Sequence, residues 1–332
     1  NWRAIAEDPL PAAQLSAIVA TEHERTTLDI TIMSRQVGGR EGESAEAPTA
    51  SRRFRVNGIA RRASDLIGRL RTVMFSADDV ALIDGAPAGR RRFLDVTISQ
   101  LEPLYVRALQ RHARVLVQRN SLLRRLLERR GDPGELDFWD AEIASAAAVL
   151  VRSRASLLGS LHDLAAAQHD RLVTRPSPLA VEYLPALPRE LLDGLLEPGL
   201  DERILDVMRA GRAADLRRGL TLVGPHRDDF ALTLGGHAAG AFASRGEQRT
   251  IALALRLGEV ALSKQRTGEA PVLLLDDVLS ELDARRRAHV VEAAYEVDQV
   301  FITTPDEDRP APQELPGACR YRLVNGELQT QR

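Results

Sequence analysis

A run of four apolar residues that ends in two acidic ones constrains the fold of this chain more than any other segment. Val272–Leu275 has the length and composition of a strand that is buried on both faces, as in a parallel sheet covered by helices. Asp276 and Asp277 follow directly. Because ligands of open α/β sheets bind beyond the carboxyl ends of the strands, acids here predict a site for a cation or for reaction chemistry. An alternative is a strand that leads into a helix N-cap, where Asp is also favoured.

The two acids suit different tasks in such a site. Asp276 is predicted to bind Mg²⁺ directly or through water, because Mg²⁺ prefers hard oxygen ligands. Asp277 is predicted to be the catalytic residue that orients or deprotonates an attacking water.

A second segment places small and polar residues before a predicted helix at 247–263. Ser244 and Gly246 stand at its start, with Arg245 and Glu247 beside them. A hydroxyl and backbone N–H groups at a helix N-terminus can bind an anion, aided by the helix dipole. The alternative is an ordinary capped helix with Ser244 near the cap.

These segments carry a resemblance. Residues 244–250 resemble the signature motif of ABC ATPases, although Arg245 and Glu247 depart from its consensus, and Ser280–Asp283 resembles the D-loop that follows the acidic strand in those proteins. The chain is identified as a member of the RecF family by four further stretches, and the resemblance covers about residues 1 to 330. Those stretches are residues 75–79, 85–95, 118–120 and 224–229. Ala77 stands where the family usually has Pro.

The resemblance implies an ABC-ATPase head of the SMC-like, P-loop NTPase type that binds ATP and Mg²⁺ and dimerises around ATP. It implies binding to DNA at single-strand/duplex junctions, recombinase loading at replication gaps with RecO- and RecR-type partners, and a role in the SOS response. The residues that it assigns to the nucleotide are Ser244, Gly246, Glu247 and Asp283. Thr303 and Thr304 stand where a switch histidine is expected, and Asp277 where many ABC enzymes carry Glu, so we expect slow hydrolysis.

The order of predicted elements gives an α/β fold with an inserted helical arm. The chain divides into part of an ATPase head at 1–95, the arm at 96–215 and the rest of the head at 216–332. Strands are predicted at 14–21, 27–33, 53–56, 70–75, 220–223, 230–234, 272–275 and 299–303. Long helices are predicted from about 95 to 169 with a break at 131–134, and further helices at 77–83, 188–214, 247–263 and 284–294.

Charge is concentrated in one block. The formal net charge is −2, but residues 52–130 hold 18 arginines and 7 acidic residues. Such a block predicts a polyanion surface, and solvated arginines on helix faces are the alternative. The candidates for contact with the DNA backbone are Arg90, Arg91, Arg92, Arg107, Arg111, Arg114 and Arg119.

Near the start of the last third, residues 224–229 place His226 and Arg227 beside Asp228 and Asp229. These cations next to paired acids could bind phosphate or a metal. The alternative, which we favour, is a structural turn that links the arm to the head and in which the acids pair with those cations, so we assign no functional role to the stretch.

One expected motif is absent from the sequence. No G-x-x-x-x-G-K-[ST] occurs, and Lys264, the single lysine, lies at a predicted helix end without a glycine-rich turn. We therefore expect an N-terminally truncated copy that lacks the P-loop and does not hydrolyse ATP unaided. A degenerate, non-hydrolysing scaffold that binds DNA or a repair partner is the alternative, whereas the arm and the arginine block argue against a transporter subunit.

Cys319 is the single cysteine, which excludes an intramolecular disulfide. With no apolar run of membrane-spanning length and no visible secretory signal, we expect a cytoplasmic protein.

Overall fold

The computed structural model centres on a parallel sheet of three strands in the order β10-β9-β5. These strands are β5 (Thr72–Ser76), β9 (Val272–Asp276) and β10 (Val300–Thr303). The sheet thus combines a strand from before the helical arm with two from after it. The structure describes residues 12–22, 24–35, 49–305 and 315–331.

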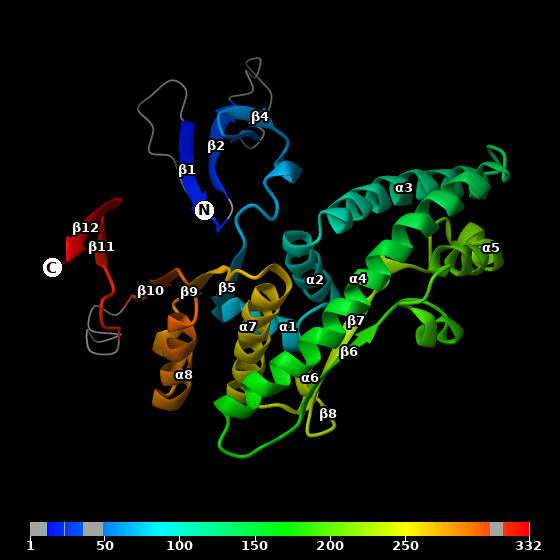
Figure 1. The fold of residues 1–332 in the computed structure, drawn as a ribbon. Helices are drawn as coiled ribbons and strands as arrows, with labels where there is room; N and C mark the ends of the chain where they lie inside the picture. Colours follow the sequence, from blue (N-terminus) through cyan, green and yellow to red (C-terminus); the bar gives the residue numbers. More distant parts are fainter. Residues whose placement is uncertain (1–11, 23, 36–48, 306–314, 332) are drawn as a thin grey trace, which may run out of the picture.

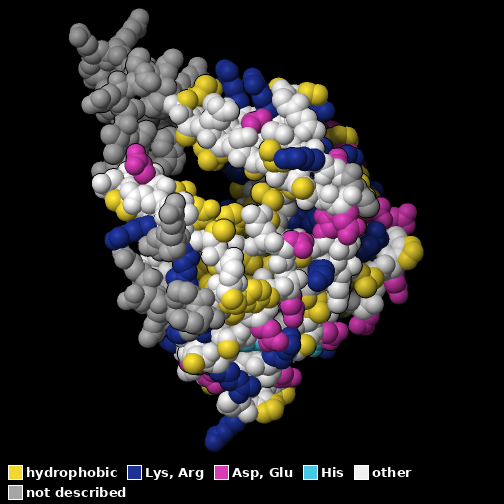
Figure 2. Space-filling model, turned by 60° about the vertical axis from the view of Figure 1, so that its left-hand side comes forward, with side chains coloured by type: hydrophobic (Ala, Val, Ile, Leu, Met, Phe, Trp, Pro, Cys, Tyr) yellow, Lys and Arg dark blue, Asp and Glu magenta, His cyan; other side chains and the backbone are white. Residues whose placement is uncertain are grey.

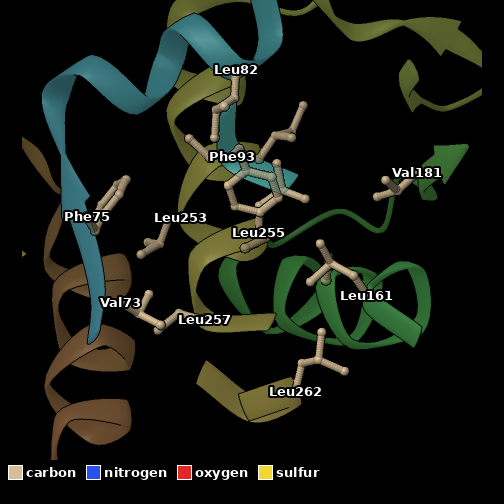
Figure 3. Close-up of a cluster of buried hydrophobic side chains, with 14 of the residues drawn as sticks. Val73, Phe75, Leu82, Phe93, Leu161, Val181, Leu253, Leu255, Leu257 and Leu262 are labelled. Atoms are coloured by element: carbon tan, nitrogen blue, oxygen red, sulfur yellow. The ribbon is translucent and has the colours of Figure 1, made fainter. Parts of the chain in front are cut away.

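Helices cover one face of this sheet (Figure 1). They include α7 (Arg245–Thr267), α8 (Ala284–Tyr295) and α2 (Pro87–Leu101). Side chains of β5 and β9 alternate, as a pleated strand requires. Figure 3 shows Val73 and Phe75 of β5 turned toward Leu253 and Leu257 of α7 in the buried core.

The opposite face of the sheet is open among the described residues. Met74, between the buried Val73 and Phe75, is 45% exposed, and Phe301, between the half-buried Val300 and Ile302, is 55% exposed. Figure 2 shows hydrophobic side chains gathered at mid-height on this side of the molecule, below a hollow.

A separate antiparallel sheet stands above the parallel one in Figure 1. Its turn at Asn57 and Gly58 has φ of 50° and 77°, the left-handed values that an Asn-Gly hairpin turn requires. The Asn57 Oδ1 atom accepts a hydrogen bond from the backbone N–H of Thr27 at 2.8 Å. This sheet confirms the predicted first strands and hairpin. Its strands are β1 (Ala12–Ala20), β2 (Arg25–Arg35), β3 (Thr49–Val56) and β4 (Ile59–Arg61).

The arm is built on α3 (Pro103–Leu127) and α4 (Glu135–Leu172), with α5 (Leu200–Arg218) packed across them. At 1.5 Å per residue, the 38 residues of α4 span about 57 Å. The long helix predicted from about residue 95 is in fact two helices, because Pro103 cannot donate a helical hydrogen bond and instead begins α3.

In the later part of the chain, one strand prediction is wrong and one strand was not predicted. Residues 220–223 form no strand, and a strand that was not predicted, β6 (Leu179–Leu184), pairs with β7 (Asp229–Leu234). The turn at 235–236 leads into β8 (His237–Ala238). The remaining elements are η1 (Ala63–Asp65), η2 (Ala77–Val80), α1 (Ala81–Asp84), η3 (Arg189–Gly194), η4 (Pro225–Arg227), α6 (Ala239–Phe242), η5 (Leu279–Glu281), β11 (Arg320–Val324) and β12 (Glu327–Gln331).

Arg154 of α4 ties the arm to the head. Its guanidinium, 2% exposed, lies 2.8 Å from a carboxylate oxygen of Asp95 and 2.8 Å from one of Asp228. It also donates to the Tyr105 hydroxyl at 3.0 Å and to the Pro225 carbonyl at 2.6 Å. One buried cation therefore joins α2, α3, α4 and the segment before β7.

Within the part of the chain that the structure describes, no helix is long and apolar enough to cross a membrane.

Candidate nucleotide site and arginine surface

The carboxyl edge of the parallel sheet carries the predicted acidic pair. Asp276 ends β9 opposite Thr303 of β10, and the Thr303 hydroxyl donates a hydrogen bond to Asp276 Oδ1 at 2.5 Å. Both side chains are exposed. Thr303 therefore fixes the rotamer of the predicted metal ligand from the position where a switch histidine was expected.

Asp277 adopts an unusual backbone conformation for a residue that is not glycine. Its φ is 53°, in the left-handed region. Its backbone N–H donates to the Thr303 carbonyl and hydroxyl, both at 3.2 Å, and the Ser280 hydroxyl donates to Asp277 Oδ1 at 2.7 Å. A strained backbone conformation of this kind persists where the surrounding contacts hold it in place, and such conformations are concentrated at functional sites.

The oxygen atoms at this edge suit Mg²⁺ chemically. Asp276, Asp277 and the Thr303 hydroxyl supply hard oxygen donors on adjacent strands. The described residues contain no cluster of three or more His, Cys, Asp or Glu side chains able to hold a metal by themselves. That donor set fits a cation which binds one or two carboxylates and takes its other ligands from phosphates and water.

The predicted signature segment begins α7 with a closed capping box. The Ser244 backbone N–H donates to Glu247 Oε2 at 2.8 Å and its hydroxyl donates to the same oxygen at 2.7 Å. These hydrogen bonds from Ser244 lower the pKa of the exposed Glu247 carboxyl. A Cβ placed on Gly246 would meet no atom within 4 Å, so the space in front of this turn is open.

The structure brings the signature helix to the same edge as the acids. Arg249 of α7 lines a small cavity together with Ser76, Val278 and Leu282, which lie at or beyond the ends of β5 and β9. Asp283, the other predicted nucleotide contact, caps α8 and accepts a hydrogen bond from the Arg286 backbone at 2.9 Å. Two hydroxyls that orient the acids were not predicted: that of Thr303 is placed by strand pairing, and that of Ser280 by the turn that follows Asp277.

The arginines that were predicted to contact DNA fall into two groups. Some are exposed, and others are held in ion pairs within the protein. The prediction for Arg119 is wrong, because its side chain is 0% exposed and is paired with Asp140 and Asp215, each at 2.7 Å. Arg90, 13% exposed, is held by Asp229 at 2.6 Å and offers little surface to a ligand. Those that lie exposed are Arg92, Arg107, Arg111 and Arg114, with Arg91 half-buried.

The expectation that the acids of the 224–229 turn pair with His226 and Arg227 is wrong. Asp228 pairs with Arg154 and Asp229 with Arg90. The His226 ring instead lies 5.7 Å from the His112 ring of α3. Burial lowers the pKa of His112 to about 3, which the nearby His226 and Arg154 reinforce, so this imidazole is neutral at physiological pH.

Comparison with known proteins decides the family. The chain is 40% identical over 334 residues to the DNA replication and repair protein RecF of Chloroflexus aurantiacus, covering 99% of the chain and 84% of that protein. The chain belongs to the RecF family. It is also 41% identical over 319 residues to RecF of Herpetosiphon aurantiacus, covering 95% of the chain and 80% of the relative. It is therefore shorter than these RecF proteins. No protein-family model matches it.

Solved RecF structures share its fold. A structure of the recombination mediator protein RecF-ATPrS in the RecFOR pathway superimposes with a TM-score of 0.81 at 25% identity, covering 97% of this chain and 81% of that one. A RecF-ATP structure superimposes with a TM-score of 0.75 at 26% identity, covering 93% and 81%. The predicted fold, an ABC-ATPase head with a helical arm, is confirmed.

Proposed function

We propose that the chain is an ATP-dependent DNA-binding protein of recombinational repair and replication-gap processing. The observation that carries this proposal is the meeting of the Asp276–Asp277 pair with the signature helix α7 at one edge of the sheet. In this proposal the protein is cytoplasmic and dimerises with a second copy around ATP. It binds DNA at single-strand/duplex junctions and, with RecO- and RecR-type partners, loads a recombinase and takes part in SOS induction.

Each residue at the edge has a task in this proposal. Asp276 holds Mg²⁺, which when bound neutralises charge on the phosphates. Asp277, its carboxylate fixed by Ser280, orients the attacking water. Ser244 and Gly246 offer a hydroxyl and an N–H to the γ-phosphate held by the second copy, with Glu247 and Asp283 beside them. We expect slow hydrolysis, because the short Asp277 side chain positions a water less closely than Glu.

Nucleotide binding is expected to require a phosphate-binding loop, which this sequence does not contain. No phosphate-binding loop motif occurs in the chain, so neither acid can act on ATP until phosphates are held beside it. The test is a chimera that joins the P-loop segment of the Chloroflexus aurantiacus relative to the chain. ATP should then dimerise the chimera and increase its retention of gapped DNA, measured by light scattering and fluorescence anisotropy.

A matched variant makes that test specific. Asp276→Asn changes one exposed carboxylate and should abolish both effects of ATP, whereas Asp298→Asn, an exposed acid beyond α8, should leave them unchanged. A chimera that neither binds nucleotide nor dimerises would refute the ATPase proposal.

One observation favours the second candidate, a non-hydrolysing scaffold that binds DNA or a repair partner. The Ser244 hydroxyl and N–H are both occupied by the Glu247 carboxylate, whose negative charge would repel a phosphate at this turn. Under this candidate, Glu247→Gln has no effect on the chimera's affinity for ATP. Under the ATPase proposal the same change strengthens ATP-dependent dimerisation.

A further inference from the structure

A groove of about 660 Å³ lies where β4 and η1 meet the base of the arm. Its walls come from β4, η1 and the turn that follows, the end of α2 and the start of α3. The charged residues in these walls, among those the structure describes, are four arginines and one acid: Arg61, Arg69, Arg71, Arg107 and Asp65. The groove is therefore lined by net positive charge.

Two of these arginines have no internal partner. Arg61 and Arg107 are exposed, and neither forms an ion pair or side-chain hydrogen bond within the described part of the chain. Arg111, one turn beyond Arg107, is by contrast held by Glu142 at 2.7 Å. Unpaired guanidinium groups in a concave surface concentrate positive potential, because the low-dielectric walls focus the field.

The other two arginines are only partly engaged. Arg69 lies 3.6 Å from Glu24 in an exposed pair, and its Nε donates to the Asp65 carbonyl at 2.9 Å. Arg71 is bound by Glu269 at 2.5 Å, but its buried Nε has no partner among the described residues. Asp65, Glu24 and Glu269 thus offset part of the charge, and the guanidinium groups of Arg61 and Arg107 remain without a carboxylate partner among the described residues.

Guanidinium groups of this kind recognise phosphate oxygens, to which they donate paired, charge-assisted hydrogen bonds. The cationic surface continues beyond the groove, since the exposed Arg114 has no carboxylate partner among the described residues and lies about 10 Å from Arg107 along the axis of α3. A string of phosphates fits this extended arrangement better than a single anion does. We propose that the groove binds the sugar–phosphate backbone of DNA, with Arg61 and Arg107 as its principal contacts.

This inference rests on the proposed function, in which the chain binds DNA. The test uses the 332-residue chain and a fluorescein-labelled gapped duplex, with affinity measured by anisotropy between 50 and 200 mM NaCl. The double variant Arg61→Gln/Arg107→Gln should weaken binding roughly 15- to 30-fold at 0.15 M salt and reduce the salt slope by about 1.4 to 1.8, the values for two lost phosphate contacts.

Matched controls separate position from charge. Arg175→Gln/Arg189→Gln removes two other exposed arginines that have no partner in the described structure, and should change affinity less than about twofold. Arg61→Lys/Arg107→Lys should keep most of the salt slope, because the point charges remain. Equal thermal midpoints for all variants show that folding is unchanged.

The outcomes distinguish the two proposals. If the unaltered chain fails to bind DNA at low salt, the proposed function is overturned and this inference with it. If it binds DNA and the groove variant binds with the same affinity and slope, only the groove assignment is overturned. If the groove variant no longer binds inorganic pyrophosphate but keeps its affinity for DNA, the groove is a small-anion site and the DNA assignment is wrong.

Discussion

Replacing Arg119 with Met should unfold the arm more easily rather than weaken DNA binding. The substitution removes hydrogen bonds from the guanidinium to Asp140, Asp215 and Thr221 at 2.7, 2.7 and 2.8 Å. Breaking a buried ion pair by removing one partner costs about 3–5 kcal/mol, because a carboxylate is left without its cation.

The structure places the expected loss near the lower end of this range. Asp140 keeps a cation, since Arg212 Nε lies 2.6 Å from its other oxygen. Asp215 keeps only the backbone N–H of Leu222 at 3.1 Å. With one of two carboxylates left uncompensated, we expect the free energy of unfolding to fall by about 3 kcal/mol.

Urea unfolding followed by Trp139 fluorescence measures this loss locally, because Trp139 packs against the buried cluster of the arm beside Asp140. A Trp2→Phe background removes the other tryptophan of the chain. Arg114→Met, on the exposed face of α3, should change stability by less than about 0.5 kcal/mol.

A second variant tests the cause. Adding Asp215→Leu to Arg119→Met removes the stranded charge and should recover part of the loss. The reasoning is refuted if Arg119→Met costs less than about 1 kcal/mol, or if it lowers DNA affinity while the unfolding transition stays where it was.

Three further predictions follow from single features. Because the pKa of His112 falls from 6.5 when unfolded to about 3 when folded, the unfolded chain binds the extra proton between these values, and stability should fall by about 1.4 kcal/mol for each pH unit below 6.5. Denaturation of His112→Gln at pH 5.5 and 7.5 should show a smaller difference than the unaltered chain, and an equal difference would contradict this. Gly258→Ala should cost about 1–3 kcal/mol in thermal or urea unfolding, because the new Cβ would lie 3.1 Å from the Ala165 backbone nitrogen, and a neutral result would mean that α4 and α7 can separate freely. Asp277→Asn should be stable to within about 0.5 kcal/mol, whereas Asp277→Val should lose about 1–3 kcal/mol, because β-branched residues resist a φ of 53°; equal midpoints for the two would argue against a strained turn.

The sequence correctly predicted those elements whose conformation is set by residues close together in the chain. The apolar run before Asp276 is a buried parallel strand, and the Asn57–Gly58 pair makes the hairpin turn. Strand β6 was missed because its pairing with β7 crosses the whole of α5, and no signal within six residues reveals a partner about 50 residues away.

The error at Arg119 has a different origin. The spacing of the arginines predicts that they share one solvent face of the helix, but α3 packs against both α4 and α5. A signal was available, since Val115, Arg119 and Leu122 recur at helical spacing and all three are buried. An arginine within an apolar stripe indicates an internal ion pair rather than a ligand contact.

The uninterrupted helix α4 joins the arm to the head. Its 38 residues run without interruption from Glu135 at the arm tip to Leu172, and the charges near His169, in its last turn, include Glu247 of the signature turn. Arg154, paired with Asp95 and Asp228, lies about 28 Å from Glu135 and about 22 Å from His169 along the helix axis. One uninterrupted helix therefore connects the arm tip with the signature turn, and one buried cation holds that helix to the head.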